Sequence, residues 1–335
     1  MVQQELLTGR TVVVTGGAGF LGSHLVELLR RDGWTVRTLD RRQGTDVLDS
    51  AAVASAVSGA DVVIHAAFAA PTRPLDEIRR VNVEGTRHVL SAAHQHGSRV
   101  VVVSSTIVEQ SRGAHPLLPN SPLSAMAAYA RTRREAEEAA VDALANGLSV
   151  AIARPKTLVG PGAVGAFALL FDLVRGGNPV PALGDGRNRY QLLDVRDFAS
   201  GLAALATSEA TGVFSFGAAE FGTVREDLEG LLAIAATDAT LRFVPAPVGR
   251  VLLRAMELVG LPLASDWHWA CARNEGSVVA IDRAVELGWH PARSNVRALI
   301  DAYRWFVSEE NAAAVPSTVP STHRLVARAF AQWPS

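Results

Sequence analysis

Cysteine and lysine are almost missing from this chain of 335 residues, which has one of each, Cys271 and Lys156. A single cysteine excludes an internal disulfide and any metal site built from several cysteines. We expect it to be a small buried side chain rather than a catalytic thiol. None of the nine histidines stands at a metal-ligand spacing, so we expect no metal.

An excess of either charge and long apolar runs are missing too. The 32 basic and 33 acidic residues give a formal net charge of −1, so no basic surface points to nucleic acid. No uninterrupted apolar run reaches the roughly 18 residues that suggest a membrane span. The first residues are polar and acidic, unlike a secretion signal. We therefore expect a cytoplasmic protein with neither nucleic-acid nor membrane partners.

What the sequence does contain is a regular alternation of two kinds of segment. Short β-branched runs predict strands over Val12–Thr15, Thr35–Leu39, Val62–His65, Val100–Ser104 and Ser149–Ala153. Longer alanine-rich segments between them predict helices over Phe20–Arg31, Ser50–Ser58, Leu75–His96 and Ser124–Asn146. The predicted strands are apolar on both faces, as in a parallel sheet covered by helices. The alternation predicts an α/β fold, a Rossmann-type doubly wound parallel sheet.

A glycine pattern, Thr15–Gly22, directly follows the first predicted strand and opens a helix. In that context Gly16 permits a tight turn, Gly19 lets the backbone approach a pyrophosphate, and Gly22 lets the helix pack closely on the strand. The phosphates would be held by free N–H groups at the positive end of the helix dipole. The cofactor contacts expected of this turn are Gly16, Gly19, Phe20, Leu21 and Gly22.

An acidic residue, Asp40, closes the second predicted strand about 20 residues beyond the glycines, where a carboxylate binds a ribose 2′-hydroxyl and favours NAD. Arg41 and Arg42 follow it, and either would pair with the 2′-phosphate of NADP. Asp46-Val47 then precedes the third crossover helix. We predict dinucleotide binding, with NAD as the favoured cofactor and NADP as the alternative.

The pattern loosens after Arg154-Pro155, where glycine- and proline-rich turns interrupt the chain. We predict a dinucleotide-binding domain over residues 1–155, which strands from about residues 189–216 rejoin. A smaller substrate-binding domain is expected over residues 156–188 and 217–310. Residues 311–335 read as a linker followed by a C-terminal helix.

Further motifs occur in a fixed order along residues 10–306. They are Thr15–Gly22, Asp40, Asp46-Val47, His65-Ala66-Ala67, Asn82–Thr86, Val103–Ser105, Tyr129, Arg154-Pro155, Gly160–Gly162, Gly184–Arg187 and Leu287–Pro291. This ordered set resembles the extended short-chain dehydrogenase/reductase family, the NAD-dependent epimerase/dehydratase group. The resemblance implies cofactor contacts at Arg41, Asp46, Val47, His65, Ala66, Ala67, Tyr129, Arg133, Pro155 and Lys156. It also implies a homodimer formed through the segments 75–96 and 124–146.

The resemblance implies catalytic roles for several residues. Ser105, with Thr106 as the neighbouring alternative, would polarise a substrate C–O group, and Tyr129 would be the general acid/base. Asn82 would brace a water or the backbone. A tyrosine is a weak base at neutral pH, so it requires a nearby positive charge. In the family that charge is a lysine four residues after the tyrosine, on the same helix face.

Here the lysine position holds Arg133, which keeps the charge but replaces a compact ammonium with a planar fork. Three interpretations stay open. Arg133 does the lysine's work with altered geometry; Lys156 supplies the charge instead; or the redox function is lost or redirected. Lys156 is equally consistent with a charge on a surface loop.

The expected substrate class rests on positions where this sequence departs from the family's motifs and on short matches to its epimerases. Thr106-Ile107 stands where the family's dehydratases carry Asp-Glu, which argues against a 4,6-dehydratase. Substrate contacts are expected at Thr157, Arg189 and Arg273, at or beside positions where epimerases hold a nucleotide diphosphate. We predict an NAD(P)-dependent epimerase or oxidoreductase that transfers hydride at a C–OH carbon of a nucleotide-sugar-like substrate. The alternatives are a ketoreductase or dehydrogenase on a non-nucleotide hydroxyl compound, and a non-catalytic dinucleotide-binding regulatory protein.

Overall fold

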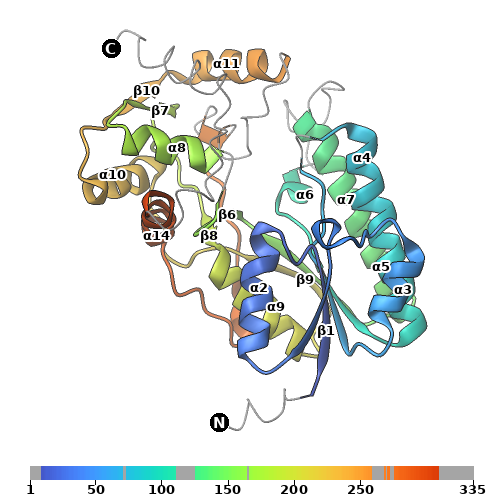
Figure 1. Cartoon of the computed structure of the whole chain (residues 1–335). Coiled ribbons are helices and arrows are strands. Elements are labelled where there is room, and N and C mark those ends of the chain that lie inside the picture. The colour runs from blue at the N-terminus through green and yellow to red at the C-terminus, as the bar shows by residue number, and fades with distance from the viewer. Residues whose placement is uncertain are drawn as a thin grey trace. The chain divides into compact units, whose positions relative to one another are not determined.

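A computed structural model describes residues 9–70, 73–110, 125–163, 166–258, 268, 270–271 and 275–308. The chain divides into two compact units (Figure 1). Unit 1 comprises Met1–Lys156, Arg196–Phe216 and Ala280–His290. Unit 2 comprises Thr157–Val195, Gly217–Val279 and Pro291–Ser335. Each unit is therefore assembled from segments that lie far apart in the sequence.

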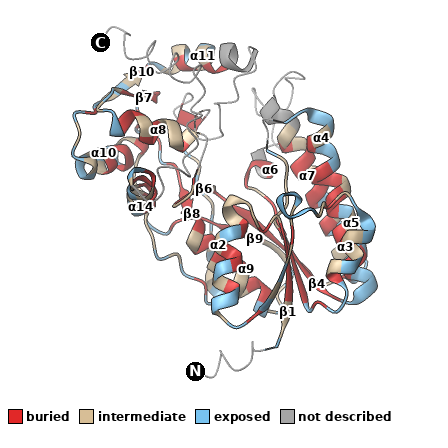
Figure 2. Cartoon of the chain, viewed as in Figure 1, coloured by how far each residue is buried: buried red, intermediate tan, exposed pale blue. Residues whose placement is uncertain are grey.

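Unit 1 is built on a six-stranded sheet in the order β2-β1-β3-β4-β5-β9, in which every pairing is parallel. The strands are β1 (Thr11–Thr15), β2 (Thr35–Leu39), β3 (Val62–His65), β4 (Arg99–Val103), β5 (Val150–Pro155) and β9 (Gly212–Phe216). The central strands are buried along their length (Figure 2), because helices cover both faces of the sheet. The predicted Rossmann-type α/β fold is confirmed.

Helices α2 and α9 cover one face of the sheet, and α3, α4, α5 and α7 lie on the other (Figure 1). The helical segments of unit 1 are α2 (Phe20–Arg31), η1 (Arg41–Gln43), α3 (Ser50–Val57), α4 (Leu75–Arg79), η2 (Arg80–Glu84), α5 (Gly85–His96), α6 (Ile107–Gln110), α7 (Ala125–Ala145), α9 (Val195–Thr207) and α13 (Asp282–Glu286). Alternate strand residues such as Val13, Val63 and Val100 pack with Val53 and Val89 of the helices in one apolar core. This core fixes the strand ends from which the site is built.

The single helix expected over residues 75–96 is wrong in detail, because a π-helical turn interrupts it. That turn, η2, separates α4 from α5 and contains the fully buried Asn82. In a π-turn the backbone hydrogen bonds join residues five apart instead of four, an irregularity that is common near functional sites. Gly85 follows it, where a Cβ atom would lie 2.7 Å from Val47 Cγ2. The apolar periodicity of the segment does not report this local change of hydrogen bonding.

Unit 2 contains two small parallel sheets with helices around them. One pairs β6 (Thr157–Val159) with β8 (Leu192–Asp194), and the other pairs β7 (Val180–Leu183) with β10 (Leu241–Val244). The described part of unit 2 includes the helices α8 (Ala166–Arg175), α10 (Val224–Ala235), α11 (Ala246–Leu258) and α14 (Asn295–Val307). Phe171 of α8 packs against Tyr303 and Phe306 of α14, with ring centroids 5.9 and 5.7 Å apart.

The strands β8 and β9 belong to different sheets, which differs from the predicted return of strands from residues 189–216 to the first domain. β9 joins the large sheet beside β5, whereas β8 pairs with β6 inside unit 2. Residues 280–290 also belong to unit 1, where Trp289 Nε1 donates to Asp197 O at 2.9 Å. The predicted linker and C-terminal helix over 311–335 lie outside the described residues. Over the part of the chain that is described, no helix is long and apolar enough to cross a membrane.

Candidate active site

The glycine turn between β1 and α2 leaves no room for side chains. Gly16 has φ +71°, and a Cβ atom there would lie 2.9 Å from Ala67 Cα. A Cβ atom on Gly22 would lie only 2.1 Å from Gly16 O. Gly19, the N-cap of α2, is extended, so the first N–H groups of the helix stay open at this turn. The turn thus has the tight bend and close helix packing that a phosphate cradle requires.

A cavity of about 300 Å³ opens beside this turn, entirely within unit 1. Its lining includes eight of the residues expected to contact the cofactor: Gly16, Gly19, Asp40, Arg41, Asp46, Val47, Ala66 and Ala67. Phe68 also lines it, a residue that no motif singled out. The ends of β1, β2 and β3 deliver these residues because the carboxyl ends of parallel strands meet at one edge of the sheet.

The carboxylate of Asp40 in the cavity wall favours NAD over NADP. Asp40 accepts from the backbone N–H of Ala18 at 3.0 Å and of Arg42 at 2.9 Å. Both neighbouring arginines are engaged: Arg41 pairs with Glu77 at 2.9 Å, which raises the Arg41 pKa, and Arg42 Nη1 donates to Ala18 O at 2.7 Å. A carboxylate repels a 2′-phosphate and accepts from a 2′-hydroxyl, so this wall suits a free ribose.

His65 lies behind the cavity and not on its surface. Its side chain is fully buried, with Nδ1 2.8 Å from Thr15 Oγ1 and Nε2 3.0 Å from Thr86 Oγ1. Thr86 donates its own proton to Asn82 O at 2.6 Å, so we assign the proton of the imidazole to Nε2. Burial, with a smaller contribution from the charge of Arg133, lowers the pKa of His65 to about 3. His65 is thus a neutral structural side chain, which differs from the cofactor contact predicted for it.

Asn82 joins the cavity wall to the helix that carries Tyr129. Its Oδ1 accepts from Ala69 N–H at 2.9 Å, and its Nδ2 donates to Thr132 Oγ1 at 2.9 Å. Thr132 in turn donates to the backbone oxygen of Tyr129 at 2.8 Å. We expected Asn82 to brace a water or the backbone, and in the structure it holds the backbone of Ala69 and the hydroxyl of Thr132.

Arg133 lies one helical turn after Tyr129 on α7 and is only 4% exposed. Its guanidinium carbon is 3.4 Å from the ring centroid of Phe68 and 5.9 Å from that of Tyr129. Nη2 donates to Val103 O at 3.0 Å, whereas Nε and Nη1 have no hydrogen-bond partner among the described residues. Burial lowers the pKa of Arg133, and the charges of Tyr129 and Glu137 oppose that shift.

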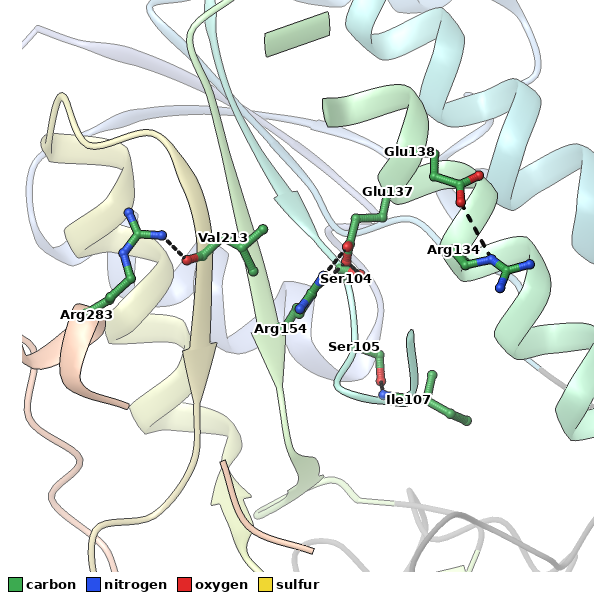
Figure 3. A network of polar contacts seen from close by, with 9 residues as sticks. All are labelled: Ser104, Ser105, Ile107, Arg134, Glu137, Glu138, Arg154, Val213 and Arg283. Carbon is green, nitrogen blue, oxygen red and sulfur yellow. Dashed lines mark hydrogen bonds and ion pairs between the residues drawn. The ribbon is translucent and has the colours of Figure 1, made fainter. Parts of the chain in front are cut away.

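Of the two predicted catalytic hydroxyls after β4, Ser105 is better placed than Thr106. Thr106 is buried and points its hydroxyl back to Pro155 O at 3.4 Å. Ser105 is half-buried, and its Oγ accepts from Ile107 N–H at 3.3 Å (Figure 3). The Ser105 hydroxyl keeps its proton to donate, which is what holding a substrate oxygen requires.

Beneath these residues lies a buried ion pair that the sequence reasoning missed. Glu137 of α7 accepts from Arg154 Nε of β5 at 2.9 Å and from Ser104 Oγ at 2.6 Å (Figure 3). Arg154 Nη2 also contacts the second carboxylate oxygen. The signal was present, because Tyr129, Arg133 and Glu137 follow at intervals of four and share one helix face.

Several other predicted residues lie in different parts of the chain. Lys156 is 2% exposed, so the surface-charge interpretation is wrong. In unit 2, Thr157 Oγ1 lies 2.7 Å from Tyr190 Oη, and Arg189 donates to Phe221 O at 3.2 Å. Arg273 lies outside the described residues. Cys271 is buried, and the described residues contain no His, Cys, Asp and Glu group that could hold a metal.

The family model for the NAD dependent epimerase/dehydratase family matches residues 12–217. The chain belongs to this family. It is 30% identical to the protein y4nG of Sinorhizobium fredii over 331 residues, which cover 94% of this chain and 83% of that protein. It is also 29% identical to a ceramide reductase of Caulobacter vibrioides over 305 residues, covering 84% of this chain and 86% of the other.

The fold is similar to a UDP-glucuronic acid 4-epimerase from Bacillus cereus in complex with NAD. The TM-score is 0.69 at 21% identity, covering 88% of this chain and 98% of the epimerase. The family confirms the resemblance that the ordered motifs indicated. This protein is therefore an NAD-dependent enzyme of the extended short-chain dehydrogenase/reductase group.

Proposed function

We propose that this enzyme catalyses reversible hydride transfer at a C–OH carbon, with Tyr129, Ser105 and Arg133 as the reacting constellation. One observation carries the proposal: a buried arginine cation lies beside the tyrosine on one face of α7, 5.9 Å from its ring. The carboxylate in reach, Glu137, is occupied by Arg154 and Ser104, so the charge of Arg133 remains available to Tyr129.

The chemistry divides between the residues and the cofactor. NAD, when bound, accepts or returns the hydride. The Ser105 hydroxyl donates to the substrate oxygen, and Tyr129 removes the hydroxyl proton in oxidation and returns it in reduction. Arg133 stabilises the negative charge that develops on the tyrosine oxygen, an effect that burial strengthens. The glycine turn and the 300 Å³ cavity of unit 1 fit a dinucleotide, because any side chain at Gly16 or Gly22 would fill the cradle.

A nucleotide sugar is the first candidate substrate, with epimerisation as the reaction. The support is the family itself and the likeness to a UDP-glucuronic acid 4-epimerase. An epimerase oxidises and re-reduces one carbon, so it has no need to release its cofactor. The expected homodimer and cytoplasmic location stay predictions.

Reduction of a non-nucleotide ketone is the second candidate, and specific contacts favour it. Thr157 and Arg189, at or beside the positions of nucleotide contacts in epimerases, are engaged within unit 2 by Tyr190 and Phe221. The similarity to a ceramide reductase over 84% of this chain points the same way. A purely regulatory dinucleotide-binding protein has no need of Tyr129 and Ser105.

The deciding experiment is to denature freshly purified protein and identify any nucleotide that is released. Near-stoichiometric NAD supports the epimerase, with UDP-glucose as the first probe. Protein that emerges empty but binds added NADH supports the reductase, with ethyl acetoacetate as the first probe. Protein that is empty and binds neither NAD nor NADPH contradicts the proposal.

Tyr129→Phe tests the constellation directly. We expect turnover to fall by about 10²-fold or more while NAD binding is kept, because only the proton-transferring hydroxyl is removed. Tyr303→Phe is the matched control, since Tyr303 lies on α14 of unit 2 against Phe171. Turnover in Tyr129→Phe equal to that of the control would refute Tyr129 as the acid/base.

A further inference from the structure

The closest cation–aromatic contact in the described part of the chain is that of Arg133 on Phe68. The guanidinium carbon lies 3.4 Å from the ring centroid, whereas the other such contacts range from 3.8 Å for Arg225 on Phe243 to 5.9 Å. Arg133 is also nearly fully buried. A guanidinium in this position lies flat on the negative face of the ring.

This contact answers a physical problem that the arginine creates. A buried cation requires compensation. The charge of Glu137 acts on Arg133 from a distance, but among the described residues the carboxylate of Glu137 forms its ion pair with Arg154. Arg133 Nη2 is satisfied by the Val103 carbonyl, and Nε and Nη1 are not satisfied. The face of Phe68 therefore supplies the compensating interaction that a carboxylate would otherwise provide.

Phe68 is itself held firmly. The preceding backbone N–H groups of Ala66 and Ala67 both donate to Thr15 Oγ1 at 3.1 Å, and that of Ala69 donates to Asn82 at 2.9 Å. The Phe68 ring packs on His65 with centroids 5.0 Å apart. The backbone is hydrogen-bonded both before and after Phe68, so the orientation of its ring is fixed. The ring in turn fixes the plane of the guanidinium that stacks on it.

We propose that Phe68 is the positioning residue for Arg133, and that the two act as one unit in place of a lysine. The inference rests on the proposed function of Tyr129. The stack on Phe68 sets the plane of the guanidinium, and the charge stays beside Tyr129. A lysine would not be oriented in the same way, because an ammonium lacks the planar face that stacks on the ring and is more strongly hydrated.

The test is a double-mutant cycle of Phe68→Leu and Arg133→Lys in the full-length enzyme, with kcat, KM and NAD affinity measured for each protein. Turnover is followed on whichever probe the wild type uses, UDP-glucose or ethyl acetoacetate. We expect Phe68→Leu to lower kcat at least tenfold in the wild type and less than threefold in Arg133→Lys. Phe68→Trp, which keeps an aromatic face, should lose less kcat than Phe68→Leu, and Arg133→Lys alone should lose at least tenfold.

Two results overturn the inference. Equal losses from Phe68→Leu in both backgrounds would mean that the residues act independently. A loss confined to NAD affinity with kcat unchanged would make Phe68 a cavity wall only. Phe214→Leu is the matched control. It removes from β9 an aromatic ring whose centroid lies 4.4 Å from the guanidinium carbon of Arg283, and it should leave kcat unchanged. Phe68→Met replaces Phe68→Leu if the smaller side chain prevents folding.

The cycle also separates this inference from the proposed function. Wild-type protein that binds NAD but turns over neither probe contradicts the proposed function alone. The same four proteins are then compared by thermal unfolding with NAD bound. A stabilisation by Phe68 that disappears in Arg133→Lys supports the pair, and additive effects overturn it.

Discussion

At the scale of single residues, burial decides which charges the site contains. His65 and Arg133 belong to the same buried region, yet the histidine is neutral and the arginine remains the positive group. Two threonine hydroxyls satisfy both ring nitrogens of His65, so neutrality costs it no hydrogen bond. Arg133 is therefore the positive charge beside Tyr129, and the imidazole of His65 behind the cofactor cavity carries none.

A pH dependence of stability follows from His65. Its pKa is lowered to about 3 in the folded protein, below its unfolded value, so the unfolded chain binds the proton more readily. Stability is therefore lost as pH falls below about 6.5, and the loss continues towards pH 3. When the pH falls from 7.5 to 5.5, we expect the free energy of unfolding of the wild type to decrease by about 1.4 kcal/mol more than that of His65→Gln.

Urea unfolding at a series of pH values measures this difference. The contribution of His268, whose pKa burial lowers to about 4, is the same in both proteins and cancels. Parallel stability curves for the wild type and His65→Gln would show that His65 does not titrate on unfolding in this range.

At the scale of elements, the Glu137–Arg154 ion pair ties α7 to β5 directly under the reacting residues. Both side chains are less than a tenth exposed. Glu137→Gln leaves the Arg154 cation buried without its partner, which typically costs about 3–5 kcal/mol. Because α7 carries Tyr129 and Arg133, we expect activity to fall together with stability.

Glu138→Gln is the matched control on the next position of the same helix. Glu138 lies 3.6 Å from the partly exposed Arg134, a surface pair worth only about 0.3–0.5 kcal/mol. The free energy of unfolding in urea compares the two variants. Equal losses would refute the claim that the buried pair holds α7 against β5.

The sequence predicts elements better than contacts. The first five strands of the large sheet were expected within about two residues of their observed bounds, because β-branched runs between turns leave few other choices. The π-turn at Asn82 was not foreseen, since apolar spacing says nothing about which carbonyl each N–H selects. Phe68 was also missed, because its importance depends on Arg133, a residue distant in sequence that reaches it only in the folded sheet. Motifs report local backbone needs, and pairings across the fold carry no such local signal.

At the scale of the whole molecule, unit 1 depends on a short segment near the end of the described chain. Trp289 is 4% exposed, its ring lies 4.9 Å from that of Phe216, and its Nε1 donates to Asp197 O. Trp289→Ala should destabilise unit 1 by about 3–5 kcal/mol, the usual cost of such a cavity. Thermal unfolding followed with and without NAD measures it.

Trp289→Phe keeps one aromatic ring in the core but removes the five-membered ring with its N–H group, so it should cost less than Trp289→Ala. We expect it to lose about 1 kcal/mol. If Trp289→Ala unfolds like the wild type, residues 280–290 are not an integral part of unit 1.

The interleaving of the two units also sets the order in which a ribosome can complete them. When residues up to about 207 have emerged, β5 is still the outer strand of the growing sheet, because its neighbour β9 follows only at Gly212–Phe216. Such an unpaired edge invites pairing with other chains. Residues 280–290, which contain α13 and Trp289 and complete unit 1, are synthesised only after most of unit 2. The nascent enzyme therefore passes through a long stage in which its cofactor domain is unfinished, and a chaperone that shields strand edges would protect it then.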